Sequence, residues 1–151
     1  MQDELGRERV DRVLALASRH VGLEQRALAF GATRDALLAV DSAVINGAIT
    51  MATGIASVDA CREPELLRRL PAPPGAAQRE AVTEIHRELA EARALDAAGK
   101  FEPGLVIAEA TLARASELGH RELLADARLT VGGLQSSAGA FESAARTLED
   151  A

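Results

Sequence analysis

The sequence predicts an all-α fold, and its composition gives the first reason. Its 151 residues include three Phe and no Trp or Tyr, so the core has to consist mainly of Ala, Leu and Val. Ala and Leu lead the scale of helix propensity, whereas aromatic and β-branched residues lead the strand scale. Apolar residues also recur at steps of three, four and seven, the period of an amphipathic helix. A chain of this length can bury enough core for one domain or two small helical layers.

Residues 1–74 are predicted to form an irregular N-terminal helical region. A helix is expected over residues 3–40, which Gly31 ends or bends before a second segment over residues 34–40. The apolar stripe of this helix comprises Val10, Leu14, Ala17, Val21 and Leu28. Asp41 then offers an N-cap for the next helix. That helix carries Val44, Ile45, Ala48, Ile49 and Ala52 at helical spacing.

The dipeptide Asn46-Gly47 inside this second helix is also a signal for a β-hairpin. We favour the helix, because two short strands would stand alone in a helical protein and a lone hairpin is marginal in water. Residues 65–70 can form a short helix, and the three prolines within residues 71–74 forbid any continuation of it. This Pro-rich stretch is the predicted linker to residues 75–151.

Residues 75–151 are predicted to form two successive antiparallel helical hairpins. The first helix spans residues 76–98 and is ended by Gly99, which can take a left-handed conformation. The second helix begins near Phe101, continues to residue 118 and is stopped by Gly119. A third helix from about residue 121 to Gly139 and a fourth from Phe141 complete the pattern.

The two glycine turns of these hairpins recur with a period of 40 residues, since "GKFE" at residues 99–102 matches "GAFE" at residues 139–142. Small residues precede and follow each turn at corresponding positions, where they allow helices to pack closely. We expect the Phe of each turn to fill the wedge beneath it. The predicted repeat-packing residues are Ala92, Gly99, Phe101, Gly104, Gly132, Gly139, Phe141 and Ala144.

This pattern resembles the tetratricopeptide repeat, in which a Leu-Gly pair, a turn, an aromatic residue and a small residue follow in order. Val131-Gly132 stands at the Leu-Gly pair, Phe141 at the aromatic position and Ala144 at the small position. The period of 40 exceeds the usual 34, the Trp of the first helix is absent, and the second repeat stops inside its second helix. The resemblance implies a right-handed α-solenoid fragment with one full and one partial repeat.

A second resemblance rests on the order of motifs over residues 19–151. These motifs are "RHVGLEQR", "DSAVINGAI", "DACREPELL", "PAPP" and the long helical run from "ELAEARALDAAGKFEPG" to "ARLTVGGL". Together they resemble the region that follows the kinase domain in large serine/threonine protein kinases of myxobacteria and related bacteria. Gly22 stands where such relatives commonly have a Cys. The resemblance implies a signalling chain whose catalytic domain lies elsewhere, because this sequence has no glycine-rich loop after a strand, no His-Arg-Asp and no Asp-Phe-Gly motif.

Charge and residue usage argue against several other classes. The net charge of −6, with arginines interspersed among acidic residues, does not suit a nucleic-acid partner. The apolar run over residues 42–58 is too short for a membrane span, and the charged N-terminus does not look like a secretion signal. The single Cys61 suits a reducing compartment, and we expect a cytoplasmic protein. Cys61 is interpreted as a small buried residue, with a reactive thiol as the alternative.

No catalytic, metal or cofactor site is predicted. His20, His86 and His120 are not at metal-ligand spacing, and "VGGLQSSAG" lacks the preceding strand and following Lys of a phosphate loop. An enzyme would instead require a deep polar pocket around a His and a carboxylate.

A repeat of this type presents a concave surface lined by the first helix of each hairpin. The predicted partner-binding residues are His86, Leu89, Arg93, Asp96, Asp126 and Leu129, with Gly133 and Ser136 beyond them. The planar guanidinium of Arg93 suits a carboxylate or a peptide C-terminus. We therefore expect a non-catalytic protein–protein interaction or regulatory module of a signalling protein.

Two further hypotheses accompany this reading. The segment is alternatively a purely structural spacer that positions a kinase or sensor domain. Because the last helix is uncapped, we also expect a homodimer formed through Ala144, Ala145 and Leu148.

Overall fold

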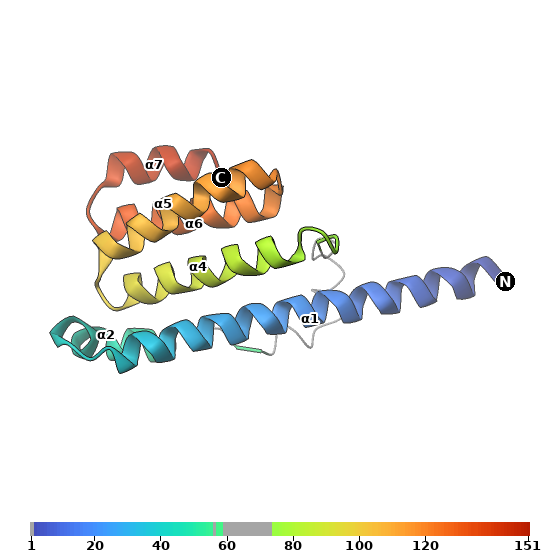
Figure 1. Cartoon of the computed structure of the whole chain (residues 1–151), viewed down its shortest axis with the longest axis horizontal. Helices are drawn as coiled ribbons and strands as arrows, with labels where there is room; N and C mark the ends of the chain where they lie inside the picture. Colours follow the sequence, from blue (N-terminus) through green and yellow to red (C-terminus); the bar gives the residue numbers. More distant parts are fainter. Residues whose placement is uncertain (1, 56, 59–73) are drawn as a thin grey trace.

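The computed structural model describes residues 2–55, 57–58 and 74–151, and all regular structure in these residues is helical (Figure 1). The helices are α1 (Gln2–Leu38), α2 (Ser42–Thr53), α4 (Arg79–Ala97), α5 (Phe101–Leu118), α6 (Arg121–Ser137) and α7 (Phe141–Glu149). The predicted all-α class is confirmed. Cys61, the expected helix over residues 65–70 and most of the Pro-rich linker lie outside the described residues.

The helices form two stacked hairpins with a long helix beside them. Helices α4 and α5 make the first antiparallel hairpin, and α6 and α7 make the second (Figure 1). Helix α1 packs along the side of α4 that faces away from α5, and its N-terminal part extends beyond the end of α4. As a result α1, α4 and α6 run in the same direction, while α5 and α7 run in the opposite direction.

Glycine turns end three of the helices, as the sequence predicts. Gly99, Gly119 and Gly139 have positive φ values of 73°, 69° and 79°, a region that a Cβ atom disfavours. After α4, the N–H of Lys100 donates to the carbonyl of Leu95 at 2.8 Å, and the N–H of Gly99 donates to Asp96 at 2.9 Å. The same pair of bonds recurs around Gly139. This Schellman pattern satisfies carbonyls at the helix end and reverses the chain within two residues.

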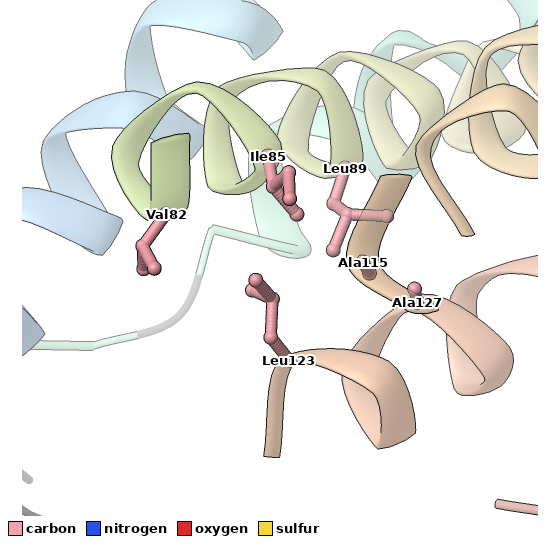
Figure 2. Packing of buried hydrophobic residues seen from close by; sticks show 6 residues of the cluster. All are labelled: Val82, Ile85, Leu89, Ala115, Leu123 and Ala127. Carbon is pink, nitrogen blue, oxygen red and sulfur yellow. The ribbon is translucent and has the colours of Figure 1, made fainter. Parts of the chain in front are cut away.

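The core lies between α4, α5 and α6 and is built from small and aliphatic side chains. One cluster comprises Val82, Ile85, Leu89, Ala115, Leu123 and Ala127 (Figure 2). A second cluster comprises Ala92, Ala108, Val131 and Leu134. Gly104 and Gly132 are buried beside the second cluster and permit close approach. A Cβ atom on Gly104 would lie 2.9 Å from Leu134 Cδ2, and one on Gly132 would lie 2.6 Å from Leu148 Cγ.

The junction of α1, α2 and α4 explains why a glycine stands within α2. Asp41 caps α2 by accepting a 2.9 Å hydrogen bond from the N–H of Val44, and Lys100 Nζ lies 2.6 Å from Asp41 Oδ2. The hydrogen bond from Lys100 and the backbone N–H of Val44 lower the pKa of Asp41. A Cβ on Gly47 would lie 2.6 Å from the carbonyl oxygen of Ala97. Asn46 and Gly47 both lie within α2, so the pair is helical, as predicted.

Two expectations about α1 and one about α7 need correction. Gly31 does not end α1, which continues to Leu38. One interior glycine costs about 1 kcal/mol, and this cost is outweighed by packing along α4 and by the helix-forming residues on either side. Val10 of the predicted apolar stripe is exposed, since this part of α1 extends past α4. Phe141 does not fill a wedge: its side chain is 69% exposed, because α6 is the one described helix that packs against α7. Phe101, at the equivalent position, is half-buried.

The expected dimer surface on α7 is partly used within the chain. Ala144 is 4% exposed, and Leu148 lies over Gly132 of α6. Ala145 remains exposed, and Leu148 is 41% exposed. Ala144 therefore has almost no surface to offer to a second molecule.

Candidate functional site

A groove of about 440 Å³ brings together charged side chains from several helices. Its walls come from α1, α4 and the start of α6, which run in the same direction (Figure 1), and from Met51 and Gly54 at the end of α2. We call it the inner groove, and its polar lining residues are Gln25, Arg26, Thr33, His86, Arg93, His120, Glu122 and Asp126. Apolar residues of the same walls include Val21, Ala29, Val82, Ala90 and Leu123. Its volume falls within the range of pockets that hold small ligands or parts of a peptide.

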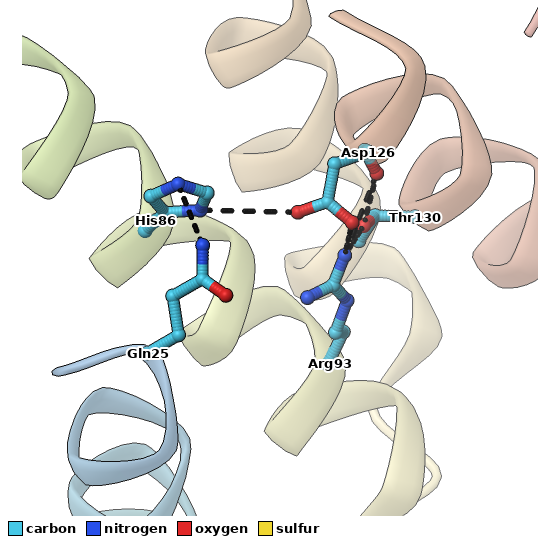
Figure 3. A network of polar contacts seen from close by, with 5 residues as sticks. All are labelled: Gln25, His86, Arg93, Asp126 and Thr130. Atoms are coloured by element: carbon cyan, nitrogen blue, oxygen red, sulfur yellow. Dashed lines mark hydrogen bonds and ion pairs between the residues drawn. The ribbon is translucent and has the colours of Figure 1, made fainter. Parts of the chain in front are cut away.

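An ion pair across α4 and α6 forms one wall of the inner groove. Arg93 Nη2 lies 2.6 Å from Asp126 Oδ1 and 2.7 Å from the hydroxyl of Thr130 (Figure 3). Thr130 in turn donates to the carbonyl of Asp126 at 2.8 Å, so its hydroxyl oxygen is free to accept from the guanidinium. The side chains of Arg93 and Asp126 are 49% and 34% exposed. Within the part of the chain that the structure describes, every polar contact of Arg93 uses Nη2, which leaves its Nε–H and Nη1–H groups available as separate donors.

His86 extends this network from α4 towards α1. Its Nε2 atom lies 3.1 Å from the amide nitrogen of Gln25, and its Nδ1 atom lies 3.9 Å from Asp126 Oδ2 (Figure 3). Burial lowers the pKa of His86 below its usual 6.5, and Arg93 adds to this effect, while Asp126 opposes it. The imidazole is therefore neutral at pH 7, with Nε2 accepting the hydrogen bond from the Gln25 amide.

The structure brings together three of the six predicted partner-binding residues. His86, Arg93 and Asp126 meet in the inner groove. The expectation for Leu89 is wrong, because Leu89 is 0% exposed and lies in the core between α4, α5 and α6. Asp96 is half-buried with one carboxylate oxygen that has no hydrogen-bond partner, and Leu129 is exposed; neither lines the inner groove.

Sequence reasoning missed the contribution of α1. Gln25 and Arg26 line the inner groove from α1, yet nothing in their local sequence indicates which helix they will face. Thr130 was also missed, although its position one turn after Asp126 on the same helix was a usable signal, since residues four apart share a helix face.

His86 and Asp126 do not have the arrangement of a catalytic pair. The separation of 3.9 Å between His86 and Asp126 is too long for a hydrogen bond. The other imidazole nitrogen of His86 accepts from Gln25, so it is not available as a general base. Among residues 2–55, 57–58 and 74–151 no group of three or more His, Cys, Asp or Glu side chains is placed to hold a metal ion.

The length and apolar character of the described helices decide whether any of them could cross a membrane. None of them combines the length and the apolar character that crossing a bilayer requires.

Comparisons with models of known protein families, with curated proteins and with solved structures gave no significant match.

Proposed function

We propose that this chain is a non-catalytic protein-interaction module that binds an extended peptide segment of a partner in its inner groove. The observation that carries the proposal is the half-exposed guanidinium of Arg93, whose Nε–H and Nη1–H donors are not used by described residues. Each of these N–H groups can donate one charge-assisted hydrogen bond to a carboxylate or a backbone carbonyl oxygen. The partner segment is therefore expected to carry an Asp, a Glu or its own C-terminal carboxylate.

The neighbouring groups support a peptide over a strongly charged ligand. Arg26 and Arg93 are balanced in the inner groove by Glu122 and Asp126, and His86 is neutral at pH 7. Apolar side chains, mainly from α1 and α4 with Met51 of α2 and Leu123 of α6, form much of the remaining walls, which suits the side chains of a short segment. A groove with mixed charge and apolar walls favours a peptide with one acidic group.

The larger context follows from the two resemblances of the sequence. Hairpins that recur every 40 residues agree with a tetratricopeptide-like unit, in which the first helices line the binding surface. The parent chain is proposed to be a signalling protein, a bacterial serine/threonine kinase whose catalytic domain lies outside this sequence, acting in the cytoplasm. The module then recruits or regulates rather than catalyses.

A peptide-array screen of the folded chain tests the proposal, with acidic and C-terminally free peptides compared with their amidated or Asn/Gln counterparts. We expect binding that Arg93→Ala weakens about tenfold or more, since a charge-assisted pair is worth about 1.5–3 kcal/mol. Arg26→Ala, on the opposite wall, is expected to weaken it as well. Arg87→Ala is the matched control, because Arg87 lies on the same helix, pairs with Glu84 and is outside the inner groove.

A purely structural spacer is the outcome that contradicts the proposal. It predicts that no peptide binds, or that binding is equally sensitive to Arg87→Ala and Arg93→Ala. Circular dichroism of each variant separates loss of a contact from loss of the fold.

A further inference from the structure

Helix α1 has two faces, and the described part of the chain covers one of them. Ser18 is buried, and Val21 and Leu28 are half-buried on the side towards α4. On the opposite side Leu16, Leu23 and Phe30 are 65%, 42% and 57% exposed. A row of large apolar side chains on a solvated helix face is costly unless another surface covers it.

The spacing of this row is that of a coiled-coil seam. Leu16, Leu23 and Phe30 follow one another at intervals of seven residues and take the d positions of a heptad pattern. Val13 and Ala27, both exposed, take a positions three residues before Leu16 and Phe30. We call these five residues the outer face of α1.

We propose that the outer face of α1 is a homodimer interface, in which two copies of the chain pair their α1 helices in parallel. Two copies satisfy the pattern because each supplies the same apolar row to the other around a two-fold axis. The helix of 37 residues is about 55 Å long. Among the described helices it packs against α4 and α2 alone, so α5, α6 and α7 do not obstruct the pairing (Figure 1).

The charges beside the seam favour the parallel orientation. Arg19 and Arg26 take g positions and Glu24 takes an e position of the same pattern. In a parallel pair Arg19 lies opposite Glu24 of the second copy, which is the usual g–e′ ion pair, and the pair occurs twice by symmetry. An antiparallel pair would instead set the g-position arginines against each other. The polar His20 at an a position weakens the association and helps to fix its register.

Sedimentation equilibrium of the full chain, from micromolar to near-millimolar concentration, tests the interface. We expect a mass that rises towards twice the chain mass of 15.8 kDa, with a dissociation constant that Leu23→Glu raises about tenfold or more. Val106→Glu is the control, because Val106 is also an exposed apolar residue but lies on α5. A chain that stays monomeric overturns the proposal, whether a different protein or a lipid surface covers the face. A dimer that loses affinity equally with both variants, or with neither, also overturns it.

The orientation has its own test. In a Cys61→Ser background, Leu16→Cys is expected to form a disulfide between two copies on mild oxidation, since d positions meet their own equivalents in a parallel pair. Arg19→Glu is expected to weaken the dimer, and Arg19→Glu combined with Glu24→Arg to restore it. A dimer that gives no Leu16→Cys disulfide and ignores the charge reversal contradicts the parallel seam.

Discussion

Replacing Gly47 by Ala tests the packing of α2 against α4 most sharply. Gly47 is in the interior of α2, where Ala is ordinarily the better residue. A Cβ atom there would lie 2.6 Å from the carbonyl oxygen of Ala97 and 3.0 Å from Cα of Ala98. Both obstructing atoms belong to the backbone, so no side-chain rotation relieves the contact. We therefore expect Gly47→Ala to push α2 away from α4.

The size of this effect follows from the contact distances. Ordinary van der Waals contact begins near 3.4 Å, so α2 has to retreat by about 0.8 Å from Ala97. The retreat loosens the buried cluster of Val44, Met51 and Ala98. Overpacking of this kind costs about 1–3 kcal/mol, while the gain in helix propensity returns about 1 kcal/mol. The net result is a loss of roughly 1 kcal/mol of unfolding free energy.

Gly31→Ala is the matched control for this experiment. Gly31 is also interior to a helix, but a Cβ atom there meets nothing within 4 Å. It is expected to raise the unfolding free energy by about 1 kcal/mol. For a chain of this size, a difference of about 2 kcal/mol between the two variants separates their melting temperatures by roughly 4–8 °C. Equal stabilisation by the two substitutions in thermal and urea denaturation would refute the close approach of α2 and α4.

Three further perturbations address the polar contacts. Asp41→Ala removes the cap of α2 and the ion pair with Lys100, so urea denaturation is expected to show a lower unfolding free energy. Because the pKa of Asp41 is lowered in the folded state, this difference from the wild type should shrink as the pH falls below 3.8 and through the folded-state pKa. Burial lowers the pKa of His86, so on acidification the unfolded chain binds a proton at this imidazole before the folded chain does, and the unfolding free energy falls below pH 6.5. His86→Gln should flatten that part of the plot of stability against pH. Substitution of the exposed His20 is the control and should not flatten it. A double-mutant cycle of Arg93→Ala and Asp126→Asn is expected to give a coupling of about 0.5–1 kcal/mol, since both side chains are partly exposed, and a coupling of zero would contradict the bridge between α4 and α6.

The helices and their ends were the most predictable part of the fold. Gly99, Gly119 and Gly139 end helices through the local backbone conformation that they adopt, so their positions predict the turns directly. Asp41 acts locally in the same way as an N-cap. Gly31 gave the same local signal but was overridden, because tertiary packing of α1 outweighs one unfavourable residue.

The inner groove was only half predictable. The position of Arg93 on α4 and of Asp126 on α6 follows from the hairpin pattern, which sets both on the first helices of successive hairpins. The placement of α1 beside α4 does not follow, because it depends on a contact between residues about 60 positions apart, such as Gln25 and His86. The prediction for Leu89 was wrong because this residue lies between His86 and Arg93 along α4. Its burial depends on how α4 packs against α5 and α6, which the local sequence does not indicate.

The central claim is that the inner groove binds a peptide, and mapping the contact surface tests it most directly. Amide chemical shifts of the isotope-labelled chain should be followed during titration with an acidic peptide selected from the array. The account predicts that the largest changes occur at groove residues, above all Gln25, His86, Arg93 and Asp126. Changes centred on α5 and α7, or no saturable change with any peptide, would contradict it.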